Sequence, residues 1–301
     1  MESATDPILA NWVREAAASQ DPRVGAHTPV TPMLIPDVVT RPQRPEQAKV
    51  FICGGVVVKV HAPGTRRADL TARLAAIEAV ELDRVWLLPL SGRPLPAPDE
   101  RLATIWPRAT LVSTVEDPPW EDAGALLARL HQADARRLPK LPAHGGVLRF
   151  ERAVRAARGI SAEPWLGELG EGLLRRFHKS KLKYLVHGSF HLGQLGHPLL
   201  SRPWRLLDPD DLGLGDPAWD LARPAALFRL GRLPEGAWSR FTRAYQAGGG
   251  PALPQGADPL DALADVAQAS LLITAVHSLT NIGAHSKPTT DAFLDAIRPR
   301  G

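Results

Sequence analysis

The sequence predicts an α+β fold with two lobes, a small N-terminal lobe built on an antiparallel sheet and a larger, mainly helical C-terminal lobe. Two observations lead to this prediction. Strand and turn signals gather in the first part of the chain, and apolar residues with helical spacing dominate the rest. We expect the N-terminal lobe to comprise residues 1–112 and the C-terminal lobe residues 113–301. A chain of 301 residues is long enough to bury a sizeable core.

The predicted sheet rests on a hairpin signal. Two glycines, Gly54 and Gly55, separate two runs of β-branched and aromatic residues, as in a hairpin with a two-residue turn. The elements expected in the N-terminal lobe are helices at residues 7–20 and 66–80 and strands at residues 33–39, 49–53, 56–61, 84–90 and 102–106. In the second helix, Leu70, Leu74 and Ile77 share one face.

Helical spacing prevails after residue 112. The helices expected there cover residues 117–131, 148–182 with a break near 159–164, 217–230, 234–247, 258–279 and 290–298. Asp216 followed by Pro217 is typical of a helix start, because Asp caps the first turn and Pro suits its first position. Two short strands are expected between the helices, at residues 184–186 and 204–207.

The composition excludes several classes of protein. The 36 Lys and Arg residues nearly balance the 32 Asp and Glu residues, and no long basic run indicates nucleic-acid binding. No apolar run reaches the length of a membrane span, and the N-terminus lacks the apolar core of a signal peptide. Cys53 is the only cysteine, so no disulfide framework exists. We therefore expect a cytoplasmic protein without a nucleic-acid or membrane partner.

Polar side chains follow both short central strands. Gln194 comes after the first strand, and Asp208 comes directly after the second. If the strands are neighbours, an amide oxygen and a carboxylate meet at one point, and Mg²⁺ prefers oxygen ligands of this kind and shares them with phosphates.

Three motifs in this stretch occur in a fixed order. Residues 187–194 read HGSFHLGQ, residues 207–208 read LD, and residues 215–222 read GDPAWDLA. In order and spacing they resemble the catalytic core of the aminoglycoside phosphotransferase and choline kinase-like family, and the His-Leu-Gly-Gln end of the first motif resembles its maltokinase-like branch. The resemblance implies a protein-kinase-like fold and ATP-dependent phosphoryl transfer to the hydroxyl of a small molecule or peptide.

The resemblance also implies roles for matching residues. Gln194 and Asp208 would ligate Mg²⁺, and Lys59 on its valine-rich strand would hold the phosphates of ATP that are not transferred. His187 would brace the catalytic loop, and His191 would approach the γ-phosphate. From the last motif, residues Asp216 and Asp220 would support the core.

Three positions depart from the family pattern. The helix glutamate that should hold Lys59 is expected near Arg73, which has the opposite charge, so Glu78 is the best substitute. The loop expected over the phosphates lacks glycines and offers Arg41 and Arg44 instead. Ser189 stands where the family has its catalytic Asp.

The serine leaves three interpretations open, because a serine hydroxyl is a poor base. The chain is an active kinase that uses His191, Asp210 or Asp211 instead, or its acceptor needs little help from a base because the transition state is loose. The third interpretation is a pseudokinase that binds nucleotide or only a partner.

The acceptor is also open. Acidic and basic residues balance in the helical C-terminal part, whereas sites for polycationic aminoglycosides need a surplus of carboxylates. A sugar, a small alcohol, a biosynthetic intermediate and a peptide hydroxyl all fit the sequence. The competing class is an interaction scaffold, whose nucleotide pocket would be filled by side chains such as those of Arg41 or Arg44.

Overall fold

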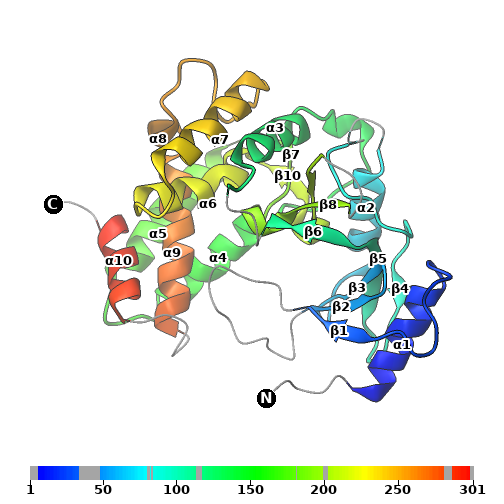
Figure 1. Cartoon of the computed structure of the whole chain (residues 1–301). Coiled ribbons are helices and arrows are strands. Elements are labelled where there is room, and N and C mark those ends of the chain that lie inside the picture. Colours follow the sequence, from blue (N-terminus) through cyan, green and yellow to red (C-terminus); the bar gives the residue numbers. More distant parts are fainter. Residues whose placement is uncertain are drawn as a thin grey trace.

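The computed structural model describes residues 6–33, 48–79, 82, 84–112, 117–180, 182–198, 203–280 and 287–298. Over these residues the chain forms a sheet lobe and a larger helical lobe (Figure 1). This confirms the predicted α+β architecture. The described residues contain no helix with the length and apolar character needed to cross a bilayer.

The sheet lobe holds one antiparallel sheet with the strand order β1-β2-β3-β5-β4. Its strands are β1 (Val30–Pro32), β2 (Lys49–Cys53), β3 (Val56–Val60), β4 (Leu95–Pro96) and β5 (Leu102–Pro107). The predicted β2–β3 hairpin is confirmed, and Gly54 adopts a φ of +63° in its turn, a conformation that glycine allows without strain. The strand predicted at residues 33–39 lies almost wholly outside the described residues.

The strand predicted at residues 84–90 is wrong. This segment makes one isolated bridge, between Trp86 and Leu206 of the other lobe. The Leu206 amide donates to the Val85 carbonyl at 2.8 Å, and the Leu87 amide donates to the Leu206 carbonyl at 3.0 Å. The apolar run therefore joins the two lobes, and the edge of the sheet is formed by β4, in a stretch expected to be a turn.

Two apolar cores stabilise the molecule. Helix α1 (Pro7–Ala18) begins at Asp6, whose carboxylate accepts from the Ile8 amide, and it buries its apolar face against the sheet. Helix α2 (Arg67–Ile77) instead joins the main core, which continues through Trp86 into the helical lobe. Because this core spans both lobes, it fixes the segments between them.

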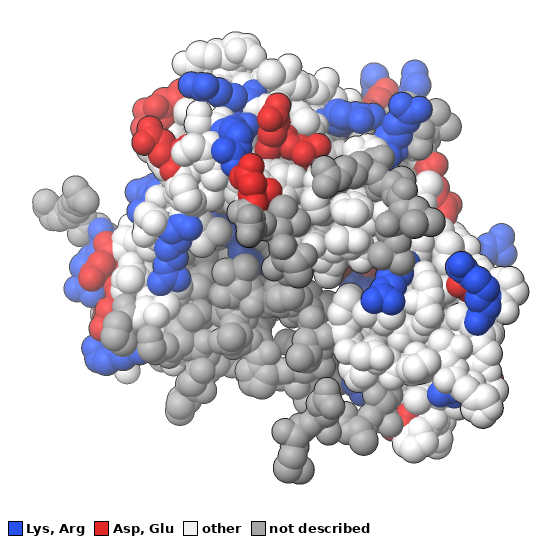
Figure 2. All heavy atoms as spheres, in the orientation of Figure 1, with Lys and Arg blue, Asp and Glu red and all other residues white. Residues whose placement is uncertain are grey.

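The helical lobe surrounds a long apolar helix, α9. Its helices are α3 (Trp120–His131), α4 (Gly145–Ala157), α5 (Trp165–Lys179), α6 (Ala218–Arg229), α7 (Glu235–Ala247), α8 (Pro259–Ala262), α9 (Ala264–Thr280) and α10 (Lys287–Ile297). Helices α4, α5, α6 and α10 all pack on α9. On the face shown in Figure 2, basic and acidic side chains are mixed over this lobe, so that face carries no extended field of one sign.

Two small sheets carry the central motifs. Strand β7 (Tyr184–Val186) pairs with β10 (Gly213–Gly215), and β8 (Leu195–Pro198) lies between β6 (Ala109–Leu111) and β9 (Arg205–Leu206). Two 3₁₀ helices, η4 (Leu192–Gln194) and η5 (Pro209–Asp211), follow β7 and β9 along the chain. A third, η3 (Ala135–Arg137), links α3 to α4. The polar clusters of both strands therefore converge between the lobes.

Candidate active site

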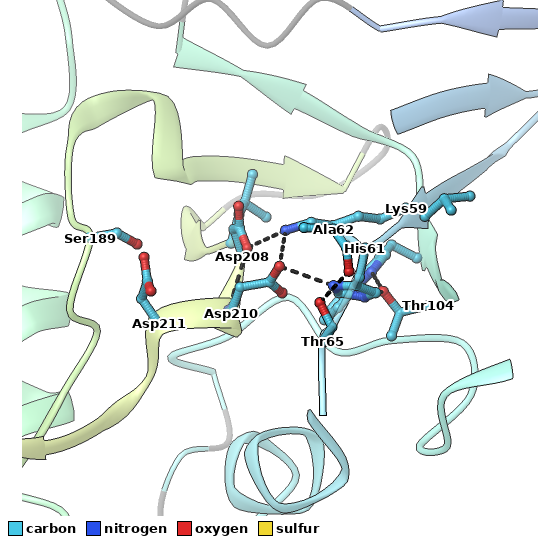
Figure 3. A network of polar contacts seen from close by, with 12 residues as sticks. Lys59, His61, Ala62, Thr65, Thr104, Ser189, Asp208, Asp210 and Asp211 are labelled. Carbon is cyan, nitrogen blue, oxygen red and sulfur yellow. Dashed lines mark hydrogen bonds and ion pairs between the residues drawn. The ribbon is translucent and has the colours of Figure 1, made fainter. Parts of the chain in front are cut away.

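Lys59 is a buried cation held by two carboxylates (Figure 3). Its ammonium forms an ion pair with Asp208 and lies 2.9 Å from Oδ2 of Asp210. The side chain belongs to β3 and is only 7% exposed. Burial acts to lower the pKa of Lys59, but the two carboxylates outweigh burial and raise it above its usual range. The lysine is therefore charged at every physiological pH.

Asp210 is the second carboxylate on Lys59, and His61 braces it. Nδ1 of His61 lies 3.0 Å from Asp210 Oδ2, and Nε2 of the same ring lies 2.9 Å from the hydroxyl of Thr104. Burial acts to raise the pKa of Asp210, but Lys59 and His61 lower it below its usual range. Since residues two apart on a strand point to the same face, the position of His61 after Lys59 was a signal in the sequence.

Glu78 is not where the sequence interpretation places it. It is exposed at the C-terminal end of α2, beside Gly92, and the described residues contain no ion pair between Glu78 and Lys59. Arg73, at the expected glutamate position, donates to the Leu212 carbonyl at 2.9 Å. Asp210 thus replaces the helix glutamate as a brace for Lys59. Arg41 and Arg44 lie outside the described residues.

Asp208 has an unusual backbone. Its φ of +61° and ψ of +74° are left-handed, a region that residues other than glycine adopt at a cost. The residue caps η5, and its Oδ1 lies 3.4 Å from the Asp210 amide. This turn lets the carboxylates of Asp208 and Asp210 contact the same Lys59 ammonium. No periodic pattern in the sequence reveals this arrangement.

A cavity of about 110 Å³ opens beside Lys59. Its walls are mostly apolar, and its polar and charged members are Lys59, Arg108, Gln194 and Asp208. Residues 106–109 and 111, from the last strand of the sheet lobe and the segment that follows it, line it as well. Such a slot fits a flat ring at one end and charged groups at the other.

The oxygen atoms at this cavity fit a magnesium ion. Gln194 and Asp208 line the same cavity, and Oδ1 of Asp210 is buried without a hydrogen-bond partner. Within the described ranges, no group of three or more His, Cys, Asp or Glu side chains gathers as a closed metal cage. Mg²⁺ needs no such cage, because it usually takes one or two carboxylates together with phosphate oxygens.

The loop after β7 is held rigidly by Asp220. The carboxylate of Asp220 accepts hydrogen bonds from the amides of His187, at 2.7 Å, and Gly188, at 2.8 Å. Nε2 of His131 lies 2.9 Å from the same carboxylate. Burial acts to raise the pKa of Asp220. The hydrogen bond and charge of His131, the charge of His187 and the hydrogen bond from the Gly188 amide outweigh burial and lower it. Asp216 lies just before α6, whose N-cap is Pro217, and its carboxylate accepts from the Ala218 amide at 3.0 Å.

His187 supports the loop from beneath. Its ring is buried, stacks on Trp86 with 5.1 Å between ring centroids, and donates from Nε2 to the Leu207 carbonyl at 2.9 Å. Its other nitrogen, Nδ1, lies 3.4 Å from the hydroxyl oxygen of Ser189. His187 therefore links the catalytic-loop position of Ser189 to the end of β9.

A carboxylate lies beside Ser189. In Figure 3 the Ser189 hydroxyl and the Asp211 carboxylate face each other. Arg149 of α4 holds Asp211 there, because one guanidinium nitrogen pairs with Asp211 and the other donates to the Gly188 carbonyl. Gly145 leaves the necessary space, since a Cβ there would lie 1.8 Å from an Asp211 oxygen. The sequence carried no signal for Arg149.

His191 lies farther along the same loop. Its Nδ1 accepts from the Gly193 amide at 3.0 Å, and its ring lines a second, larger cavity of about 340 Å³. Ser189 lines that cavity as well, whereas Gln194 lines the smaller one. The loop therefore separates the two cavities.

The comparisons with known proteins agree with this geometry. Residues 100–261 match the phosphotransferase enzyme family. No curated protein matches the chain. Among solved structures, macrolide 2'-phosphotransferase MphH from Brachybacterium faecium is similar with 18% identity and a TM-score of 0.54, over 97% of this chain and 99% of that one.

Two further solved structures share the fold. Choline kinase LicA from Streptococcus pneumoniae has 13% identity and a TM-score of 0.63, over 95% of this chain and 96% of that one. Spectinomycin phosphotransferase APH(9)-Ia, in complex with ADP and spectinomycin, has 12% identity and a TM-score of 0.56, over 98% and 96%. These likenesses confirm the protein-kinase-like fold. Because the family match covers more than half of the 301 residues, the chain belongs to the phosphotransferase enzyme family.

Proposed function

We propose that this protein transfers the γ-phosphoryl group of ATP to the hydroxyl of a small molecule in the presence of Mg²⁺. The observation that carries the proposal is the position of Lys59 and Asp208 at the polar end of an apolar cavity between the lobes. This arrangement suits a nucleotide, whose base is flat and whose phosphates are charged. Spectinomycin phosphotransferase APH(9)-Ia, which shares the fold, contains ADP.

Each residue of the cavity has a part in the proposal. The walls around Trp106 would cover the adenine, and Lys59 would contact the phosphates that stay with ADP. Asp208 and Gln194, with Asp210 beside them, would hold Mg²⁺, which neutralises charge on the phosphates. His187 and Asp220 would keep the loop in place while the acceptor enters from the larger cavity.

The proton of the acceptor needs a destination. The acceptor oxygen forms a bond to the γ-phosphorus, the bond from this phosphorus to the β–γ bridging oxygen breaks, and ADP leaves. We assign the released proton to the Asp211 carboxylate, because it faces the Ser189 hydroxyl in Figure 3 and is held there by Arg149. Both carboxylates have basic partners, Asp210 in Lys59 and His61 and Asp211 in Arg149, but Asp211 is the one that faces Ser189, which makes it the better candidate.

The second candidate function is a nucleotide-binding pseudokinase or an interaction scaffold. What supports it is Ser189, at the position where the resemblance places the family's catalytic Asp. We also propose that the protein is cytoplasmic and akin to the maltokinase-like branch, and a peptide hydroxyl remains an alternative acceptor. The sequence of the catalytic loop supports the kinship, and the supply of ATP and Mg²⁺ inside cells supports the location.

A transfer assay tests the proposal. The full chain is incubated with γ-labelled ATP, Mg²⁺ and an unfractionated small-molecule extract, and labelled products other than inorganic phosphate are measured. We expect a labelled organic product that disappears with Lys59→Met or when Mg²⁺ is chelated. Nucleotide binding without any labelled organic product would contradict the enzyme and favour the pseudokinase.

A further inference from the structure

We propose that the acceptor carries a phosphate or carboxylate group in addition to its reacting hydroxyl. This inference rests on the proposed function, because it names the substrate class of the same site. The observation behind it is the larger cavity next to Ser189, which lies on the side of the catalytic loop away from the nucleotide cavity.

The cavity has the size and position of an acceptor site. Its volume of about 340 Å³ falls within the range of small-molecule sites. It begins at residues 188–191 of the catalytic loop and extends between α4, α6, α9 and α10. The described residues that line the two cavities do not overlap. A molecule bound here can present a hydroxyl to the loop without occupying the nucleotide cavity.

The described lining of this cavity is basic. Its titratable members are Arg149, Arg223, Arg232, His191 and His277, and it contains no Asp or Glu. Asp211 lies nearby and pairs with Arg149. Arg223 lies in the middle of α6 and Arg232 in the turn after it, so both guanidinium groups come from a different element than the catalytic loop.

Arginine side chains in this setting recognise an anion. A guanidinium presents planar donors that match carboxylate and phosphate oxygens, often through two parallel bonds. The remaining walls are largely apolar, around Trp219 and Ile273, and they suit the body of a small organic molecule. These arginines would repel a polycationic acceptor, and the described lining contains no carboxylate that could offset its charge. The site therefore suits an anionic acceptor, with the anion at Arg223 and Arg232 and the hydroxyl toward Asp211.

Fractionated extracts test the inference. A small-molecule cell extract is separated by ion exchange into anionic, neutral and cationic fractions, and each is offered to the full chain with γ-labelled ATP and Mg²⁺. We expect the labelled organic product in the anionic fraction. Pretreatment with a phosphatase distinguishes the two sources, because it removes phosphate-bearing acceptors and spares carboxylates. A product confined to the neutral or cationic fraction would overturn the inference and leave the proposed function standing.

Variants on one helix and its following turn supply the matched control. Arg223→Gln and Arg232→Gln should each raise KM for the acceptor about tenfold or more, with a smaller change in kcat, because a charge-assisted contact is lost. Arg229→Gln should leave both values unchanged, since Arg229 is exposed and does not line the cavity. If Arg223→Gln and Arg232→Gln have the same KM for the acceptor as Arg229→Gln, these two arginines do not form an anion site.

A binding measurement separates this inference from the proposed function. Thermal unfolding of the full chain is followed with each fraction in the absence of ATP. Stabilisation by the anionic fraction that is lost in Arg223→Gln supports the anion site even if no phosphoryl transfer is found. Stabilisation by the cationic or neutral fraction alone, or by none, overturns it.

Discussion

Arg149 forms an ion pair with Asp211 and at the same time donates a hydrogen bond to the carbonyl of Gly188. One arginine thereby holds a carboxylate from η5 next to the residue that precedes Ser189. Three carboxylates follow β9. Asp208 and Asp210 form ion pairs with Lys59, and Asp211 lies beside the loop that carries Ser189. In this arrangement a carboxylate lies next to the loop that carries Ser189, and we propose that it serves as the base there.

The first prediction concerns Asp211. If its carboxylate takes the proton of the acceptor, Asp211→Asn should lower kcat about 10²–10⁴-fold, the usual contribution of a positioned base. The measurement is steady-state transfer by the variant and the wild type, with circular dichroism as the check on folding.

A rescue variant controls this prediction. Ser189→Asp combined with Asp211→Asn returns a carboxylate to the family position and should restore part of the lost kcat. If Asp211→Asn keeps full activity, then Asp211 is not the base.

The second prediction compares the two acidic residues proposed to brace Lys59. Asp210→Asn removes one carboxylate from the buried ammonium and should weaken ATP binding about tenfold, which corresponds to about 1.4 kcal/mol. Glu78→Gln should change ATP affinity less than twofold, because Glu78 is exposed at the end of α2. Titration of both variants with Mg-ATP measures the difference. The reverse order of effects would restore Glu78 as the partner of Lys59.

The third prediction uses the space at Gly145. A methyl group on this residue would lie 1.8 Å from an Asp211 oxygen, so Gly145→Ala must displace the carboxylate. We expect kcat to fall toward that of Asp211→Asn. Gly172→Ala is the control, because a Cβ there meets nothing closer than 3.9 Å. Normal activity in Gly145→Ala would show that the placement of Asp211 is unimportant.

The fourth prediction concerns His144, which is buried at the start of α4. Burial lowers its pKa to about 4, from an ordinary value near 6.5. Between these values the unfolded chain binds a proton that the folded protein does not, so the free energy of unfolding falls as pH falls from about 6.5 to about 4.

The size of the effect follows from the same shift. From pH 7 to pH 5 the loss attributable to His144 should be about 2 kcal/mol. Urea unfolding of the wild type and His144→Gln at both pH values isolates it, because other titrating groups cancel in the difference. A pH dependence that is equal in the two proteins would contradict the assignment.

Most of the fold could be predicted from the sequence, because the signals for its helices and for the hairpin are local. The glycine turn of the β2–β3 hairpin and the apolar faces of the helices depend only on neighbouring residues. The segment at 84–90 misled the prediction, since its apolar run also suits pairing with β9 across the lobes. The apolar pattern of one segment does not show which strand it will pair with.

The candidate site was predictable where it follows a motif. Lys59, Gln194 and Asp208 share one cavity, as the order of the motifs suggested. The contacts of Asp210 and Asp211 were not predictable, because they depend on the left-handed turn at Asp208 and on long-range pairing with Lys59 and Arg149.

Calorimetric titration of the full chain with ATP, with and without Mg²⁺, tests the central claim most directly. We expect binding that strengthens when Mg²⁺ is present and that loses this dependence in Asp208→Asn, because Asp208 is proposed to hold the ion between protein and phosphates. Absence of binding at millimolar ATP, or equal affinity in the wild type with and without Mg²⁺, would contradict the claim that Lys59, Gln194 and Asp208 form a magnesium-nucleotide site.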